Sequence, residues 1–423
     1  MPLSNLIALM KSLSSRTRKG AIFILSFWLL IALLAPWIAT TEPWYVKVGD
    51  KSYYPAFSLQ RYYSLPNAAN KMQLQDKTVY DWQKLTTSQI IFAPIPYAPN
   101  KSDLDNADYV SPFAYQVKSN NGNEVPIPLR FRHWLGTNKR GEDVLSGLLH
   151  GARFSLLIAL SAMIISLLIG VVLGVLAGFY ANTEWRSNCL VFAIKLTIVA
   201  LLFFVFFLQR FAFWRMGLEQ ESFAAEILLS VGGFTALCWI SFKAVHLLER
   251  KNWLKAKIIS IGWDTFVQRL VELIQALPLI LFLLMLSAIT RPSSWQLILV
   301  MGFVSWVSIA RIVRVELQTM RNSDYFILLR GLGVKDSRII LHRALPAILP
   351  LIGINFSVGI AHCILAEAGL SFLGIGIPAD VVSWGTLLSG AKENWNAWWL
   401  VLFPGLALAS LLLSLNGIFK KNL

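Results

Sequence analysis

The chain has 423 residues, of which 56% are hydrophobic and only 14% are charged. This balance excludes an ordinary soluble domain, because about a quarter of the residues in such domains are charged. The formal net charge of +15 could indicate a nucleic-acid-binding protein. However, the basic residues gather in short segments beside long apolar stretches, which is typical of a membrane protein instead.

Several apolar stretches reach the roughly 20 residues that a helix needs to cross a bilayer. The sequence predicts about eight such spans, near residues 20–39, 154–180, 188–208, 223–247, 270–289, 295–313, 347–367 and 397–418. The expected fold class is therefore all-α, a polytopic membrane helical bundle. The first stretch is longer than the apolar core of a signal peptide, so we interpret residues 20–39 as an uncleaved first transmembrane helix.

The positions of Lys and Arg predict how the spans are oriented. Basic residues concentrate in residues 1–19, 248–269, 314–346 and 419–423. If eight spans alternate, all four segments fall on one side, which the positive-inside rule assigns to the cytoplasm. We therefore expect both termini in the cytoplasm and residues 40–135 on the outer face.

Residues 40–135 form a polar segment that is rich in proline, tyrosine and tryptophan. The run Val46-Lys47-Val48-Gly49-Asp50 suggests a small hairpin. So long a segment is unusual as a bare loop, so we expect a small β-rich subdomain, with a spacer or a disordered loop as the alternative. Apolar residues then recur at helical spacing over 136–153, which predicts a separate interfacial helix that Thr137 or Asn138 could cap.

Two of the expected spans fall between residues 183 and 262. Two additional spans return the chain to the side that it left, so they do not change the topology downstream. We interpret 183–262 as a peripheral two-helix insertion within a transmembrane domain that covers residues 154–418.

Sequence patterns for catalysis are missing from the chain. It contains no G-x-x-x-x-G-K-[ST] phosphate loop, no G-x-S-x-G and no H-E-x-x-H, and no Cys/His set has the spacing of a zinc site. We therefore predict no catalytic residue, no metal site and no cofactor. A missing motif does not exclude a membrane-embedded enzyme, which stays an alternative.

The most regular polar segment lies between Arg321 and Pro350 and reads RNSDYFILLRGLGVKDSRIILHRALPAILP. It predicts two short helices joined at the two glycines, because glycine permits a sharp turn and a close backbone approach. Its apolar side chains and arginines are typical of a surface that docks on a partner. The residues that we expect at this contact are Tyr325, Phe326, Arg330, Gly331, Leu332, Gly333 and Arg338. An ordinary basic loop that only sets the topology is the alternative.

Three ordered blocks of sequence carry a resemblance to a known family. They are Leu135-Gly136-Thr137 through Gly151-Ala152-Arg153, the segment 321–350, and AEAGLSFLGIGIP at 366–378 followed by Ser383-Trp384-Gly385. Together they resemble the permease subunits of type I ABC importers, in the branch that carries dipeptides, oligopeptides and nickel. The chain departs from that pattern at Asn138, Glu142 and Ile327-Leu328-Leu329, where the family usually has Asp, Arg and Glu-Ala-Ala.

The resemblance implies a type I ABC importer transmembrane domain in the bacterial cytoplasmic (inner) membrane, with 314–346 as its cytoplasmic coupling loop. Such a permease forms half of the pathway for peptides and is not itself an enzyme. Its implied partners are a second permease subunit in a heterodimer, one or two cytoplasmic ATPase subunits, an extracytoplasmic solute-binding protein and membrane lipids, but no nucleic acid. Nickel or another small solute is the alternative cargo, and a membrane scaffold or receptor is an alternative of another class.

Two ionisable side chains lie within the seventh expected span, His362 and Glu367. Ionisable groups are expensive to expose to lipid, so both are candidates for the substrate pathway. The alternative is that they are ordinary packing residues. The glycines at 369, 374 and 376 predict close packing between helices.

Overall fold

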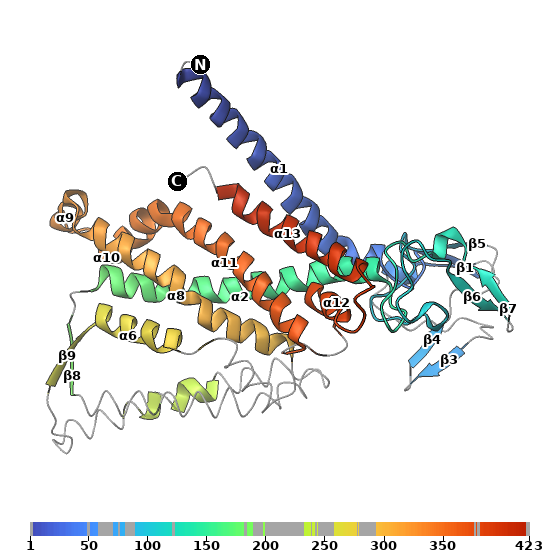
Figure 1. Cartoon of the computed structure of the whole chain (residues 1–423). Helices are drawn as coiled ribbons and strands as arrows, with labels where there is room; N and C mark the ends of the chain where they lie inside the picture. The colour runs from blue at the N-terminus through green and yellow to red at the C-terminus, as the bar shows by residue number, and fades with distance from the viewer. Residues whose placement is uncertain are drawn as a thin grey trace. The chain divides into compact units, whose positions relative to one another are not determined.

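A computed structural model of the chain describes residues 3–48, 51–57, 71–74, 77–80, 89–120, 123–181, 184–188, 198, 232–237, 239–241, 243, 258–276, 278, 293–375, 378 and 381–419 (Figure 1). The chain divides into two compact units. Unit 1 comprises Met1–Gly174 and Leu273–Leu423, and unit 2 comprises Val175–Glu272.

The described residues are mainly helical, as the sequence predicts. The main helices are α1 (Leu3–Ile38), α2 (Val144–Phe179), α6 (Trp263–Ala276), α8 (Ser294–Arg321), α9 (Asp324–Gly331), α10 (Asp336–Ile339), α11 (Leu345–Leu373), α12 (Trp384–Gly390) and α13 (Trp399–Phe419), and a π-helical turn (Ile340–Ala344) joins α10 to α11. Five stretches in this part of the chain are long and apolar enough to cross a membrane: Arg18–Ile38, Val144–Phe179, Ser294–Arg321, Asp336–Leu373 and Trp399–Ile418. They coincide with five of the eight predicted spans, and the polytopic helical fold is confirmed. The predicted spans near 188–208, 223–247 and 270–289 fall largely outside the described residues.

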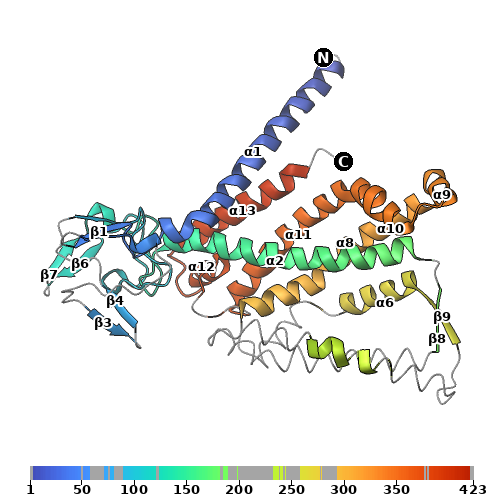
Figure 2. The same cartoon turned by 180° about the vertical axis from the view of Figure 1, so that it is seen from behind.

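Helices α1 and α13 run side by side in opposite directions, as both views of the chain show (Figure 1 and Figure 2). The indole Nε1 of Trp28 donates a hydrogen bond to Ser410 Oγ at 2.9 Å. Gly417 lies against Ala21, farther toward the start of α1 and the end of α13. The beginning of α1 and the end of α13 therefore lie at the same end of unit 1.

Helix α2 packs between partners that run parallel and antiparallel to it. Gly170 and Gly174 of α2 lie so close to α8 that a Cβ would come within 2.8 and 2.7 Å of Ile309 and Val313. Helix α11 runs antiparallel to α2, because Ser155 of α2 contacts Glu367 of α11 and Met163, farther along α2, lies against Gly359, which is earlier in α11. As a result, α8 ends and α11 begins at one end of unit 1, and the polar segment between them lies at that end.

Within the chain, the close packing predicted at the later glycines is not found at Gly369 or Gly374. No atom lies within 4 Å of the position that a Cβ would take at Gly369 or at Gly374. Gly374 instead ends α11 with a left-handed φ of +78°, a conformation that glycine adopts without strain. Gly376 lies outside the described residues.

The separate interfacial helix predicted over residues 136–153 is also wrong. Residues 136–143 form turns and isolated bridges, and α2 begins directly after them and continues through the membrane-spanning stretch. The carboxylate of Asp143 accepts a hydrogen bond from the backbone N–H of Ser146 at 2.7 Å, and this contact caps the helix. Gly151 packs tightly against α12, so the polar stretch around it does not interrupt the helix.

The segment between α1 and α2 contains short strands, as the sequence predicts. The strands are β1 (Tyr45–Val48), β2 (Lys51–Tyr53), β3 (Lys71–Leu74), β4 (Lys77–Tyr80), β5 (Gln89–Ile91), β6 (Val117–Asn120) and β7 (Asn123–Pro126). They form an antiparallel sheet in the order β2-β1-β5 and the two hairpins β3-β4 and β6-β7. Val48 lies opposite Lys51, so the hairpin predicted at Val46 to Asp50 is confirmed.

Unit 2 contains the antiparallel pair β8 (Glu184–Asn188) and β9 (Ile258–Gly262). Glu184 lies opposite Gly262, and directly opposed residues of such a pair are only about 5 Å apart. The two ends of the predicted insertion therefore lie side by side.

Candidate functional site

The polar segment between α8 and α11 folds into the two short helices that the sequence predicts, α9 and α10. Helix α9 ends in two backbone hydrogen bonds, from Gly333 N–H to Arg330 O at 2.9 Å and from Val334 N–H to Leu329 O at 3.1 Å. This pattern is a Schellman cap, which requires a left-handed residue just after the helix. Gly333 has that conformation, with φ at +76°, so the turn predicted at this glycine is confirmed.

An ion pair joins the two short helices. The Nε atom of Arg330 on α9 lies 3.0 Å from Asp336 Oδ1 on α10, and both side chains are partly exposed. Arg330 therefore has a carboxylate partner within the chain, in addition to any contact that it makes outside it. Arg338, two residues after Asp336 on α10, is exposed.

Helix α9 exposes a cluster of large apolar side chains, which we call the α9 patch. It consists of Tyr325, Ile327, Leu328 and Leu332, and Leu332 is 78% exposed. Two of the four belong to the triplet in which the chain departs from the family pattern. Exposed apolar clusters of this kind mark surfaces that bind other proteins.

Phe326 does not belong to this exposed surface. Its side chain is buried within the chain, because it projects from the face of α9 that turns toward the rest of the protein. We expected Phe326 to contact a partner, but its burial shows that it anchors α9 instead. Gly331 and Gly333 are exposed, and no atom lies within 4 Å of the Cβ position of either.

The structure separates the two ionisable residues of α11 that the sequence grouped together. They are five residues apart, so they project about 140° from one another around the helix. Glu367 is fully buried, with hydrogen bonds to its carboxylate from Ser155 Oγ at 2.5 Å and from Ser371 Oγ at 2.6 Å. His362 is exposed and lines a cavity beside α8. Glu367 therefore links α11 to α2 within the bundle, whereas His362 faces an open space.

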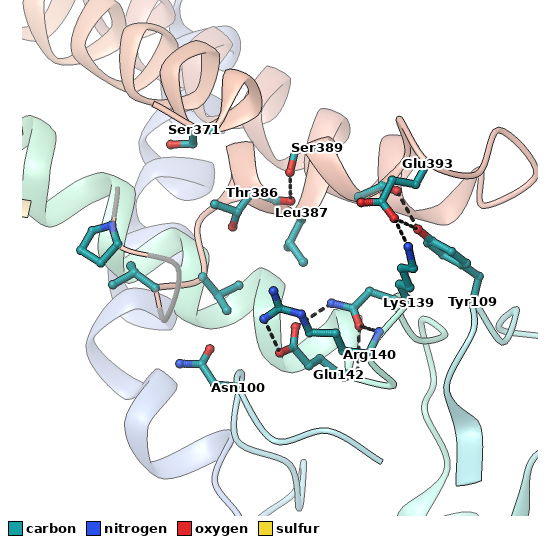
Figure 3. Close-up of a pocket in the computed structure, with 16 residues that line it drawn as sticks. Asn100, Tyr109, Lys139, Arg140, Glu142, Ser371, Thr386, Leu387, Ser389 and Glu393 are labelled. Carbon is teal, nitrogen blue, oxygen red and sulfur yellow. Dashed lines mark hydrogen bonds and ion pairs between the residues drawn. The ribbon is translucent and has the colours of Figure 1, made fainter. Parts of the chain in front are cut away.

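A cavity of about 410 Å³ lies between residues 100–142 and the region of α12, at the end of unit 1 opposite α9. Figure 3 shows Lys139 and Tyr109 converging on Glu393, and the Lys139 Nζ atom lies 2.6 Å from Glu393 Oε2. Both charged groups are well exposed, so this ion pair contributes little to stability. No sequence pattern predicts this cavity, because its walls come from segments more than 200 residues apart.

The two departures from the family pattern before α2 form a pair of their own. Asn138 Nδ2 donates a hydrogen bond to Glu142 Oε2 at 2.6 Å, and Asn138 Oδ1 accepts the backbone N–H of Glu142 at 3.0 Å. Glu142 and Asn138 therefore complete the turn between them.

A buried histidine attaches the β-rich segment to the start of α2. The Nδ1 atom of His133 lies 2.9 Å from Asp143 Oδ1, and its Nε2 atom lies 3.2 Å from Asp103 Oδ2. The ring of Tyr97 stacks on the imidazole, with centroids 4.2 Å apart. Sequence reasoning missed this cluster, because its members are spread over residues 97–143 without a recognisable spacing.

The hydrogen bonds and carboxylates around His133 raise its pKa. Burial by itself lowers the pKa of His133, but the hydrogen bonds to Asp103 and Asp143 outweigh burial, and the pKa is raised above its usual value. Burial by itself raises the pKa of Asp103, but its hydrogen bonds with His133 and Asn106 lower it below its usual value. Both shifts favour a charged histidine between carboxylates. Among the described residues, no group of three His, Cys, Asp or Glu side chains could hold a metal ion.

Known proteins have sequences similar to that of this chain. The sequence pattern of the family described as binding-protein-dependent transport system inner membrane component matches residues 260–421. A protein of Brucella ovis named as a peptide permease is 31% identical over 208 residues, which cover 48% of this chain and 68% of that protein.

Other relatives have similar names. A peptide permease of Brucella suis is 25% identical over 327 residues, covering 77% of this chain and 76% of the relative. A dipeptide transport system permease of Alkalihalophilus pseudofirmus is 31% identical over 156 residues, covering 37% of this chain and 51% of the relative. With its membrane-spanning helices, the chain therefore belongs to the family of inner membrane components of binding-protein-dependent transport systems, and it is a multi-pass permease subunit of an ABC importer.

Proposed function

We propose that this permease carries peptides and that the α9 patch docks in an apolar cleft on a cytoplasmic ATPase subunit. The observation that carries the proposal is the exposure of Tyr325, Ile327, Leu328 and Leu332 on one short helix. Helix α9 has only 8 residues, too few to cross a bilayer. Its apolar side chains therefore need a protein surface to cover them. The relatives named as peptide permeases support peptides as the solute.

The proposed assembly has a second permease subunit, which completes the pathway as a heterodimer, and one or two ATPase subunits that hydrolyse ATP. An extracytoplasmic solute-binding protein delivers the peptide to the opposite face. The shared end of unit 1 supports this orientation, because the start of α1, the end of α13 and the segment with α9 all lie there. Basic residues are concentrated in these segments, so this end and both termini face the cytoplasm.

The proposed contact is strong enough to matter energetically. Fully burying one Leu or Ile side chain contributes about 1.5–3 kcal/mol. Where the family usually has Glu-Ala-Ala, this chain has Ile327-Leu328-Leu329, so its contact surface is more apolar. We infer that the cleft of its ATPase partner is correspondingly apolar. The ion pair between Arg330 and Asp336 links α9 to α10 and contributes modestly to the position of the patch.

A matched pair of substitutions tests this proposal. Leu332→Ser removes an apolar side chain that is 78% exposed in the α9 patch, and Leu129→Ser removes one that is 71% exposed in the β-rich segment. We expect Leu332→Ser to weaken binding of the ATPase subunit about tenfold to a hundredfold. It should also reduce ATP-driven uptake of a labelled dipeptide into proteoliposomes. Leu129→Ser should leave ATPase binding unchanged.

Two results would contradict the proposal. If Leu332→Ser binds the ATPase subunit and supports uptake like the wild type, the α9 patch is not the docking surface. If the reconstituted complex takes up nickel but no peptide, the assignment of the solute is wrong, although the docking surface would stand.

A further inference from the structure

A cavity of about 400 Å³ lies in unit 1 and is lined by α8, α11 and residues 274–275 at the end of α6. We call it the membrane cavity. Its polar residues are Gln275, Ser305, Ser308, Arg311 and His362, and its other lining residues are Ile274, Val304, Val307 and Gly359. Its volume is in the range of pockets that bind small molecules.

The membrane cavity lies near the middle of the expected bilayer. Ser305 Oγ on α8 lies 3.9 Å from Cys363 Sγ on α11, so these two residues are at the same depth. At about 1.5 Å per residue, Ser305 is about 16 Å from the start of α8, and Cys363 is about 15 Å from the end of α11. The hydrocarbon core is about 30 Å thick, so the adjacent His362 lies close to its centre.

Polar side chains are exposed on the face around the membrane cavity, and contact with lipid would be costly for them. Ser308, Arg311 and His362 are all exposed, and exposure of such groups to lipid is unfavourable. Arg311 lies about 9 Å farther toward the end of α8 than Ser305. The carboxylate of Glu367 on the same helix avoids lipid by burial against α2. Since these three residues are not buried in that way within the chain, contact of their face with water or a polar solute avoids this cost, as on a solute pathway.

The charge of the membrane cavity indicates what it binds. The guanidinium of Arg311 donates a hydrogen bond to Gln275 Oε1 and carries five N–H donors in all. None of the described residues that line the cavity is acidic. A fixed positive charge beside hydroxyl and imidazole groups suits a carboxylate, which a guanidinium binds through two parallel hydrogen bonds.

We infer that the membrane cavity binds the carboxylate of the transported solute, with Arg311 as the cationic partner and Ser308 and His362 as hydrogen-bonding groups. For a peptide, this carboxylate is the one at the C-terminus. The inference rests on the proposed function, and it adds that the permease itself, and not only its binding protein, recognises the charge of the solute.

A cysteine placed in the cavity tests the inference. The cysteines at 189, 238 and 363 are replaced by alanine, Ser308→Cys is introduced, and the chain is reconstituted with the subunits that copurify with it. Ser308 and Arg311 are three residues apart on one helix face, where side chains are neighbours. The anionic sulfonatoethyl methanethiosulfonate should therefore react about tenfold faster than the cationic trimethylammonioethyl reagent. Both rates are normalised to those at Phe113→Cys, an exposed position in the β-rich segment.

Changes in the cavity and in the ligand complete the test. Arg311→Gln should abolish the preference for the anionic reagent, and Arg311→Lys should retain it. Dialanine should slow the modification of Ser308→Cys, whereas dialanine amide, which lacks the carboxylate, should not. No reaction with either reagent in any nucleotide state would overturn the inference, because it would show a face covered by lipid or by a packed subunit. Equal rates for the two reagents would overturn it as well.

Uptake of labelled dialanine by the same proteoliposomes separates this inference from the proposed function. ATP-driven uptake without a preference for the anionic reagent would refute the carboxylate site and leave the peptide permease intact. A preference for the anionic reagent and protection by dialanine without uptake would support the site and refute the proposed function.

Discussion

Replacing Gly333 with aspartate should uncouple transport from ATP hydrolysis without unfolding the permease. Gly333 has a φ of +76°, and a left-handed conformation costs an ordinary L-residue about 1–2 kcal/mol. No atom of the chain lies within 4 Å of the new Cβ, so steric strain adds nothing to this cost. The total is well below the roughly 5–15 kcal/mol that stabilises a typical domain. We therefore expect normal membrane insertion and a normal amount of protein.

The effect on docking is larger, because the new carboxylate lies next to Leu332 in the proposed contact. Burying an unpaired charged group costs about 3 kcal/mol or more, which weakens the docked state roughly a hundredfold. Gly333→Asn is the matched control, since asparagine has nearly the same shape, tolerates the left-handed conformation and carries no charge. The asparagine variant should retain most of the coupling that the aspartate variant loses.

The assay is uptake of a labelled dipeptide together with substrate-stimulated ATP hydrolysis in reconstituted complexes. For Gly333→Asp, both activities should fall to a small fraction of the wild-type value at equal amounts of permease. If both stay near wild type, the segment with α9 is not the coupling element. If Gly333→Asn fails as completely as Gly333→Asp, the turn conformation and not the charge is responsible.

Three further predictions concern the topology, the insertion and the buried histidine. A cysteine at Arg330 should react with impermeant maleimide only from the cytoplasmic side and one at Phe113 only from outside, and the reverse pattern would refute the orientation. Replacing residues 183–262 with a short cytoplasmic linker should leave the remaining spans correctly oriented in accessibility mapping, because β8 and β9 already bring the ends of this segment together; misoriented spans would show that the segment is needed for the fold. The pKa of His133 is raised in the folded protein, so its contribution to stability is complete below its usual pKa of about 6.5 and is lost as the pH rises through the folded value. Limited proteolysis of residues 40–143 should therefore be faster at pH 9 than at pH 6, and His133→Gln should remove this difference; equal rates for the wild type would contradict the assignment.

Features encoded by neighbouring residues were predictable from the sequence. The hairpin at Val46 to Asp50 follows from alternating side chains and a turn dipeptide, and the turn at Gly333 follows from a glycine after a helical pattern. The start of α2 was not predictable in the same way. Whether a helix continues through Gly151 depends on a tight contact with α12, which lies more than 200 residues away.

In the candidate sites too, patterns of neighbouring residues were predictable from the sequence, whereas contacts between distant segments were not. The spacing of Tyr325 and Leu332 placed both in a docking segment, but only tertiary packing shows that Phe326 between them is buried. His362 and Glu367 are equally plausible pathway residues in the sequence, and the hydroxyl of Ser155 on α2 distinguishes them. The partners of His133 come from a loop and from a helix cap, and no local pattern joins these two positions.

The helix that begins beside the docking segment does not stop at the membrane surface. Asp336–Leu373 forms one helical stretch of 38 residues, in which α10, the π-helical turn and α11 follow one another without a break. This stretch is one continuous helical element. It begins beside the α9 patch, and His362 lies about 39 Å along its axis. If this helical element rotated about its axis, His362 and Glu367 would move through the same angle on different sides of the helix. Because the carboxylate of Glu367 accepts a hydrogen bond from Ser155 of α2, a rotation that moved His362 away from the membrane cavity would also break this contact. Two irregular sections lie between the α9 patch and the membrane cavity: the π-helical turn and Pro350 within α11, which lacks a backbone N–H. The stiffness of these two sections would determine how much of a movement of α9 reaches His362.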